Sequence, residues 1–160
     1  NIEGLTIHLR PEAIATAFYH YSHGLKKHDG NCQRIAHGHR SMLELWVDGE
    51  RDLALEQQWA SRWADIYLGS LEDVVPLAQL DLSEQAGLCQ EPHYIGFRYQ
   101  APQGDFQLLM ARAEVELVDS DTTVELLADY IARQLEPQLA GRSLRVVAYE
   151  GVGKGAIAEL

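Results

Sequence analysis

Residues 32–39, with the sequence Cys-Gln-Arg-Ile-Ala-His-Gly-His, join two segments whose composition predicts β-strands. The segment before them, residues 13–23, alternates along its length and is rich in Ile, Thr, Phe and Tyr. The segment after them, residues 39–47, contains Met, Leu, Trp and Val. Both compositions are typical of strands. We therefore expect an antiparallel pair of strands that holds the ends of the joining loop more firmly than a free loop could.

Histidines stand where the two predicted strands meet this loop. His37 and His39 are two residues apart, and residues at this spacing point to the same face of a strand. Gly38 between them leaves room for the backbone to bend or for a ligand to come close. Counting alternate positions along the first strand places His23 on one face and His20 on the other. Three neutral imidazoles with an open fourth position are typical of a catalytic zinc ion, so we expect His23, His37 and His39 to bind Zn²⁺.

Other interpretations of these residues stay open. His37 and His39 could be histidines of a surface loop. Cys32 could be a fourth ligand, or a neighbouring acid/base thiol whose pKa a metal ion would lower. His28 lies in a polar loop, residues 24–31, and could be a spare ligand, a proton carrier or a solvated side chain.

The stretch Ser22-His23-Gly24-Leu25, the cysteine at position 32 and His37-Gly38-His39 before an apolar strand resemble the 6-pyruvoyl-tetrahydropterin synthase and 6-carboxy-tetrahydropterin synthase family. That family has a three-histidine zinc site and a cysteine in the loop before its His-Gly-His. The resemblance recurs at residues 122–128, which are similar to a Thr-x-Glu-x-x-Ala helix start, and at the strand ending in Glu150. Together these places cover about two thirds of the chain, with one long gap.

The resemblance implies a zinc-dependent lyase that acts on dihydroneopterin triphosphate or a related pterin. Zinc would polarise oxygens of the substrate side chain and acidify the adjacent C–H, with Cys32 as the general base or acid. Glu150 would anchor the pterin ring by accepting two hydrogen bonds, and Thr123 stands where the family has a supporting threonine. The family's proton relay also uses an Asp-His pair, and the sequence contains no such dipeptide. His93 is the nearest candidate to replace it.

Two further functions compete with the lyase. The first is a catalytically degenerate domain that holds zinc and binds a pterin or only supports assembly; retained metal ligands and a missing relay would fit it. The second is a zinc hydrolase using metal-bound hydroxide. The hydrolase hypothesis lacks an evident carboxylate base near the histidines, because Glu44 lies along the second predicted strand.

The remaining pattern predicts an α+β domain with an antiparallel sheet, two helices on one face and an inserted hairpin. The helices are expected over residues 53–68, where apolar residues recur at steps of three and four, and from Asp121 or Thr122 to Pro137. The other elements predicted are a short helix at 71–75, a hairpin within 93–118, and strands at 143–150 and 156–160. Residues 1–12 are expected to form a linker or edge strand, and residues 13–160 the domain, which the resemblance identifies as the tunnelling fold (T-fold).

Composition narrows the choice of partners. The chain has 160 residues, enough for one domain, and its net charge of −11 argues against a nucleic-acid partner. No apolar run approaches the roughly 20 residues that cross a bilayer, so no membrane partner is expected. Two cysteines indicate no disulfide framework, and a cytoplasmic location is the default. The resemblance implies a homo-oligomer, with trimers that pair into hexamers.

Overall fold

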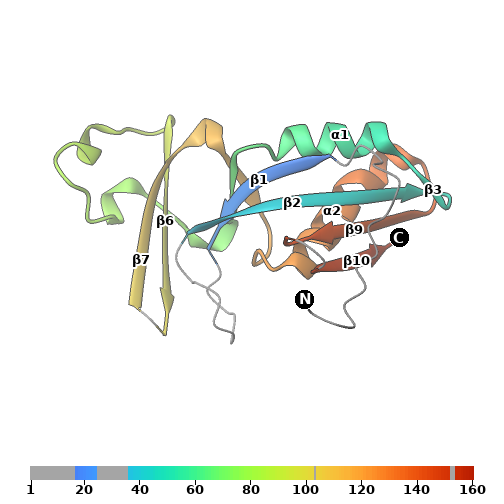
Figure 1. The fold of residues 1–160 in the computed structure, drawn as a ribbon. Helices are drawn as coiled ribbons and strands as arrows, with labels where there is room; N and C mark the ends of the chain where they lie inside the picture. The colour runs from blue at the N-terminus through green and yellow to red at the C-terminus, as the bar shows by residue number, and fades with distance from the viewer. Residues whose placement is uncertain (1–16, 25–35, 103, 152–153) are drawn as a thin grey trace, which may run out of the picture.

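A computed structural model describes residues 17–24, 36–102, 104–151 and 154–160, and its main feature is a curled seven-stranded sheet (Figure 1). Six strands follow one another across the sheet, in the order β10-β9-β2-β1-β4-β8, and β3 pairs with β2 at its end. Their bounds are β1 Phe18–His23, β2 His37–Val47, β3 Glu50–Arg51, β4 Ile66–Ser70, β8 Val115–Val118, β9 Leu144–Tyr149 and β10 Gly155–Glu159.

Strands β1 and β2 form the predicted antiparallel pair, and their register sets which side chains share a face. Tyr21 lies opposite His39, and His23 opposite His37. Further along β2, Leu43, Leu45 and Val47 alternate with outward residues and are buried. The histidines therefore lie on the core face of the sheet, beyond the end of the apolar residues.

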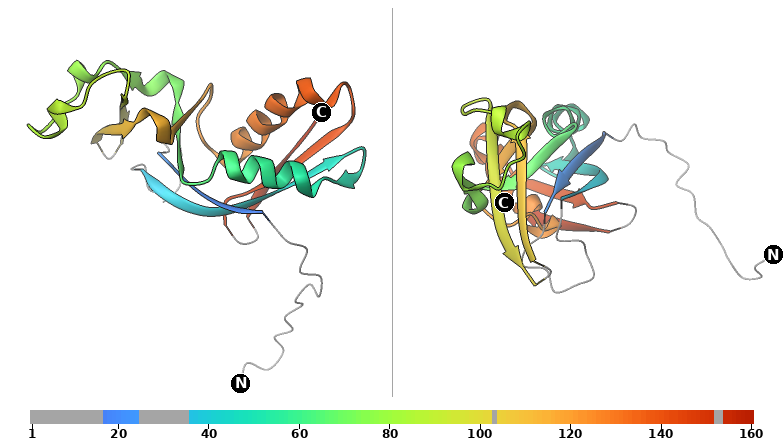
Figure 2. Two further views of the ribbon diagram at one scale, coloured as in Figure 1. Left: turned by 90° about the horizontal axis from the view of Figure 1, so that it is seen from above. Right: turned by 90° about the vertical axis from the view of Figure 1, so that its left-hand side faces the viewer.

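Two helices, α1 (Leu53–Arg62) and α2 (Val124–Leu139), cover this core face of the sheet (Figure 2). Residues of both helices pack with the inward residues of β1, β2 and β9 in one apolar cluster. Its fully buried members include Trp63, Leu127 and Ile131. The α+β class and the placement of both helices on one face are thus confirmed.

The prediction of a purely antiparallel sheet is wrong, because β4 pairs parallel with β1 and β8 pairs parallel with β4. The error begins in the helix predicted over residues 53–68, which ends at Arg62. Asp65 adopts a left-handed backbone conformation, with φ of 56°, and its N–H donates to the carbonyl of His20 at 2.7 Å. The chain turns there and continues as β4. Ile66 continues the helical spacing of the preceding apolar residues, so periodicity alone could not show the change.

The predicted hairpin is present as β6 (Tyr94–Ala101) and β7 (Gly104–Ala111), which pair antiparallel. With β5 (Val74–Val75) they form a second, three-stranded sheet, whose strands run across those of the large sheet in Figure 1. The short helix predicted at 71–75 is instead a 3₁₀ turn, Leu71–Asp73, followed by β5. Three further 3₁₀ turns span Leu77–Gln79, Ala86–Leu88 and Arg112–Glu114.

Smaller differences concern the ends of elements. The N-cap of α2 is Thr123 rather than Asp121 or Thr122, and the helix continues through Pro137 to Leu139. Its C-cap is Ala140, whose φ of 49° is left-handed. None of the helices in the described ranges combines the length and apolar character needed to cross a bilayer.

Gly69 tests the packing between the two sheets. A Cβ atom at this position of β4 would lie 2.5 Å from two ring atoms of Phe97, which is 1% exposed. Because such a ring has no room to move, we expect Gly69→Ala to lower the free energy of unfolding by about 1–3 kcal/mol. Urea denaturation measures this. Gly87→Ala is the control, since its Cβ would meet no atom within 4 Å, and equal midpoints for the two variants would contradict the packing described.

Candidate active site

Three imidazoles converge at the end of the β1–β2 pair. The ligand atoms of His23, His37 and His39 all lie within 4.8 Å of one another. The Nε2 atoms of His23 and His39 are 3.0 Å apart. In a tetrahedral zinc site with Zn–N bonds of about 2.0–2.1 Å, the ligand nitrogens lie about 3.3 Å apart, so these residues fit a metal ion with small adjustments. Tyr21 packs beneath them, its ring 5.3 Å from that of His23 and 5.5 Å from that of His39.

The start of α2 orients His23. Its Nδ1 lies 2.8 Å from the carbonyl oxygen of Thr122 and 3.0 Å from the Thr122 hydroxyl. A carbonyl oxygen can only accept, so we place the proton of the neutral ring on Nδ1, which donates to it. The lone pair is then on Nε2, which faces the other two histidines. Both His23 and Thr122 are 1% exposed, so packing holds this orientation.

Burial keeps two of the site's imidazoles, those of His23 and His39, uncharged. Together with the charges of His37 and His39, it lowers the pKa of His23 to about 3. Burial also lowers the pKa of His39, although the carboxylate of Glu150 acts in the opposite direction. Near neutral pH His23 and His39 are therefore neutral, which is the form that binds a metal ion.

A carboxylate and an ammonium continue the line of histidines across the sheet. Glu150 directly follows β9, and its side chain is 8% exposed. Its Oε1 lies 3.6 Å from Nε2 of His39, and its Oε2 lies 2.7 Å from Nζ of Lys154. Burial acts to raise the pKa of Glu150, but the hydrogen bond and charge of Lys154 hold it below its ordinary value. We call these five side chains (His23, His37, His39, Glu150 and Lys154) the polar row.

The strand register explains why Glu150 reaches the histidines. Leu43 of β2 lies opposite Ala148 of β9 on the core face. Two places further along the ladder, Ser41 comes level with Glu150, and the Ser41 hydroxyl donates to the carbonyl of Tyr149. Glu150 therefore faces the same side as Ala148, next to His39.

The other residues singled out from the sequence are placed as follows. Cys32 and His28 lie outside the described residues. Thr123 is the N-cap of α2 and makes no capping hydrogen bond with its side chain, whereas its neighbour Thr122 contacts His23. His93 is exposed just before β6, in the three-stranded sheet, and does not belong to the histidine cluster formed by the described residues. The roles of Cys32, Thr123 and His93 stay predictions.

Residues on the opposite face of the sheet do not contribute to the polar row. His20 is exposed there, as expected. Glu44 lies 3.3 Å from the indole nitrogen of Trp46 and 3.4 Å from the hydroxyl of Tyr149. The carboxylate near the histidines is thus Glu150 rather than Glu44.

Thr122 and Lys154 were missed in the sequence analysis. Thr122 contacts His23 through its carbonyl, which every residue has, and through its hydroxyl, so only the hydroxyl could have been a signal of its type. Lys154 lies four residues after Glu150 across a glycine-rich turn, and a hairpin pairing of the two could have been inferred from that spacing. 

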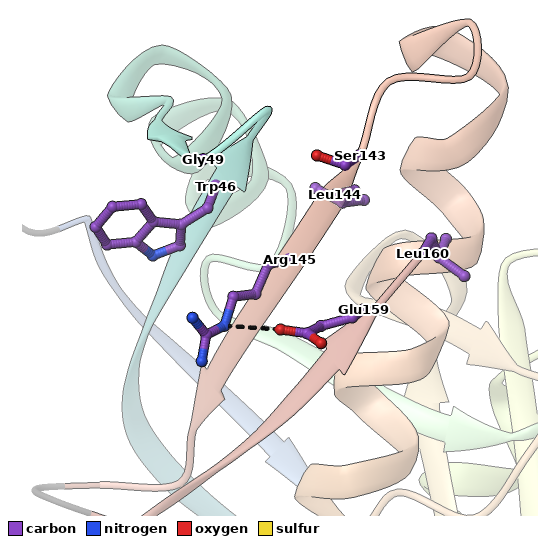
Figure 3. Close-up of a pocket in the computed structure, with 7 residues that line it drawn as sticks. All are labelled: Trp46, Gly49, Ser143, Leu144, Arg145, Glu159 and Leu160. Carbon is purple, nitrogen blue, oxygen red and sulfur yellow. Dashed lines mark ion pairs between the residues drawn. The ribbon is translucent and has the colours of Figure 1, made fainter.

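A separate hollow of about 400 Å³ lies near the other end of β2 (Figure 3). It is lined by Trp46, Gly49, Ser143, Leu144, Arg145, Glu159 and Leu160. Arg145 and Glu159 form an ion pair there at 3.2 Å, and both side chains are more than half exposed. Water screens such a pair, so electrostatic interactions in the hollow are weaker than those in the polar row.

Comparison with known proteins places this geometry in context. A family model described as 6-pyruvoyl tetrahydropterin synthase matches residues 14–67. The comparison with curated proteins finds no matching sequence. A 6-pyruvoyltetrahydropterin synthase from Plasmodium vivax has a TM-score of 0.61 at 10% identity, over 90% of this chain and 91% of that one. A 6-pyruvoyl tetrahydropterin synthase from Plasmodium falciparum has a TM-score of 0.61 at 11% sequence identity. A catalytic-residue mutant of the P. vivax protein has a TM-score of 0.60 at 11% identity, and both alignments have the same coverage of the two chains as the first.

At these identities the structures show a shared fold, including the T-fold arrangement expected from the sequence. The family model adds a match in sequence over the segment that contains all three histidines. Together they confirm that residues 14–67 and the fold around them resemble the 6-pyruvoyl-tetrahydropterin synthase family.

Proposed function

We propose that the chain is a zinc-dependent lyase acting on dihydroneopterin triphosphate or a related pterin. The observation that carries the proposal is the convergence of three imidazoles beside the buried carboxylate of Glu150. Imidazole nitrogens suit zinc, and the Thr122 carbonyl orients one of them as metal sites commonly require. The family match over residues 14–67 supports the pterin lyase class.

Each residue has a distinct task in this proposal. His23, His37 and His39 would hold zinc, which when bound would polarise the oxygens of the substrate side chain and acidify the adjacent C–H. Cys32 would accept or return the proton that leaves that carbon. Glu150 would accept hydrogen bonds from the 2-amino group and N3–H of the ring, and Thr123 would support the ring. His93 stands as the candidate for the missing relay residue.

The distance between Glu150 and His39 constrains how the ring can enter. A pterin whose pyrimidine edge binds Glu150 and whose C6 side chain reaches the histidines must span two fused six-membered rings. That span exceeds the 3.6 Å between Glu150 and His39 in the ligand-free chain. We therefore expect the Glu150 side chain to turn away from His39 when the ring binds, while it keeps its contact with Lys154.

The edges of the described sheet support a homo-oligomer, a trimer or hexamer, as part of the proposal. Strands β8 and β10 are its outermost strands, and exposed edges favour pairing with another chain. Sedimentation velocity measures this assembly state.

Metal binding tests the histidine cluster. We expect about one zinc ion per chain, and a loss of zinc in both His37→Ala and His39→Ala, because each removes one of three nitrogens. Elemental analysis of the purified proteins measures this. His20→Ala is the matched control, since His20 is exposed on the opposite face of the sheet. Full zinc content in both cluster variants would show that the metal site lies elsewhere.

Product analysis separates the lyase from a degenerate pterin-binding domain. Zinc-loaded protein given dihydroneopterin triphosphate should release inorganic triphosphate if a carbon–oxygen bond is broken, or acetaldehyde if a carbon–carbon bond is broken. Cys32→Ser should reduce the rate by about 10²-fold or more, as expected for loss of a general base. Tight ring binding with neither product would favour the degenerate domain.

Ring binding tests Glu150. A hydrogen bond to a charged group contributes about 1.5–3 kcal/mol, so Glu150→Ala should weaken neopterin binding roughly tenfold or more. Glu150→Gln keeps the shape of the side chain but replaces one acceptor by a donor, and should weaken neopterin binding nearly as much as Glu150→Ala does. His37→Ala should spare ring binding, because the histidines meet the other end of the ligand. Fluorescence titration measures all three, with Glu159→Gln as control, and unchanged affinity in Glu150→Gln would exclude the pterin assignment.

A further inference from the structure

Glu150 and Lys154 face each other across the turn between β9 and β10. The backbone N–H of Glu150 donates to the carbonyl of Lys154 at 2.8 Å, and the side chains meet at 2.7 Å. The carboxylate is 8% exposed, whereas the lysine side chain is 64% exposed. The ammonium therefore lies on the solvent side of a nearly buried carboxylate, with His39 on its other side.

This pair presents a defined order of hydrogen-bonding groups. The two oxygens of Glu150 are acceptors, and the ammonium of Lys154 beside them is a donor. A 2-amino-4-oxopyrimidine edge presents the complementary order, with donors at the 2-amino group and N3 and an acceptor at O4. A neutral 2,4-diamino ring has a second amino donor in place of O4, which would face the donors of Lys154. Its N3 carries no hydrogen and would face an oxygen of Glu150, acceptor to acceptor.

We infer that Lys154 determines specificity by donating to O4, so that Glu150 and Lys154 together select a 2-amino-4-oxopyrimidine ring. The inference rests on the proposed function, in which Glu150 holds the ring of a pterin. When Glu150 turns away from His39 to admit the ring, it stays beside the ammonium that completes the array. The long, solvent-exposed side chain of Lys154 can follow the ring edge without disturbing the sheet.

A second ion pair joins the same two strands and serves as a comparison for the Glu150–Lys154 pair. Arg145 and Glu159 also face each other across β9 and β10, but both are more than half exposed and they border the separate hollow (Figure 3). Their carboxylate does not adjoin the histidines. This pair supplies a matched control, because removing its cation changes the net charge by the same amount.

The test compares two rings that differ in their hydrogen-bonding groups at position 4 and at N3. Neopterin and 2,4-diamino-6-hydroxymethylpteridine are titrated near neutral pH, where the diamino ring is largely uncharged and neopterin keeps its N3–H. The wild-type protein should prefer neopterin by about tenfold or more. Lys154→Met should reduce this preference through weaker neopterin binding, and Glu150 accounts for the part that remains. Lys154→Arg, which keeps N–H donors, should retain it, and Arg145→Met should match the wild type.

The outcomes separate this inference from the proposed function. If Lys154→Met binds neopterin with the wild-type ratio between the two rings, Lys154 does not recognise O4, although the pterin assignment stands. If the wild-type protein does not bind neopterin, both fail. Guanosine presents the same edge without the side chain at C6, so it should bind at least about tenfold more weakly than neopterin but depend equally on Lys154. Equal affinity for guanosine would support the ring class and contradict the pterin assignment.

Discussion

The antiparallel register of β1 and β2 is the constraint on which the candidate site depends. It places His23 opposite His37 and brings His39 to the same face. A slip of one residue would turn the side chains of one strand to the other face and separate the histidines. The register is held at the other end of the same strands, where Tyr19, Leu43 and Leu45 are buried under the helices. The apolar core therefore fixes the geometry of the histidine site, although the site lies outside the core.

Helix α2 adds a second restraint from a distant part of the chain. Its N-terminal approach brings the Thr122 carbonyl to Nδ1 of His23, which sets the tautomer of that ring. The helix is held in turn by buried residues such as Leu127 and Ile131. Packing of α2 and the chemistry of His23 are thus coupled, so core substitutions in this helix should affect the metal site as well as stability.

The part of this structure that follows local rules could be predicted from the sequence. The strand pair, the hairpin and the shared face of His37 and His39 all follow from period-two patterns. The turn at Asp65 could not be predicted, because Ile66 falls on the helical step of Trp59 and Trp63 and then pairs with β1. The parallel pairing of β4 and β8 is a long-range contact without a local pattern. The nearness of Glu150 to His39 likewise depends on how β9 aligns with β2, and a sequence pattern does not specify that alignment.

The charges of the polar row suit a strongly anionic substrate in a protein that is itself acidic. Within the polar row, the carboxylate of Glu150 and the ammonium of Lys154 balance each other. A divalent ion held by the histidines would leave this corner with a local charge of about +2, while the whole chain carries −11. Local charge within a Debye length of about 8–10 Å dominates what a ligand experiences at the site, since salt screens the more distant acidic groups. A triphosphate ester of a pterin is then attracted at one end by this local charge and held at the other by hydrogen bonds between its ring and the Glu150–Lys154 pair, whose charges cancel. The net acidity of the chain therefore does not oppose the proposed substrate.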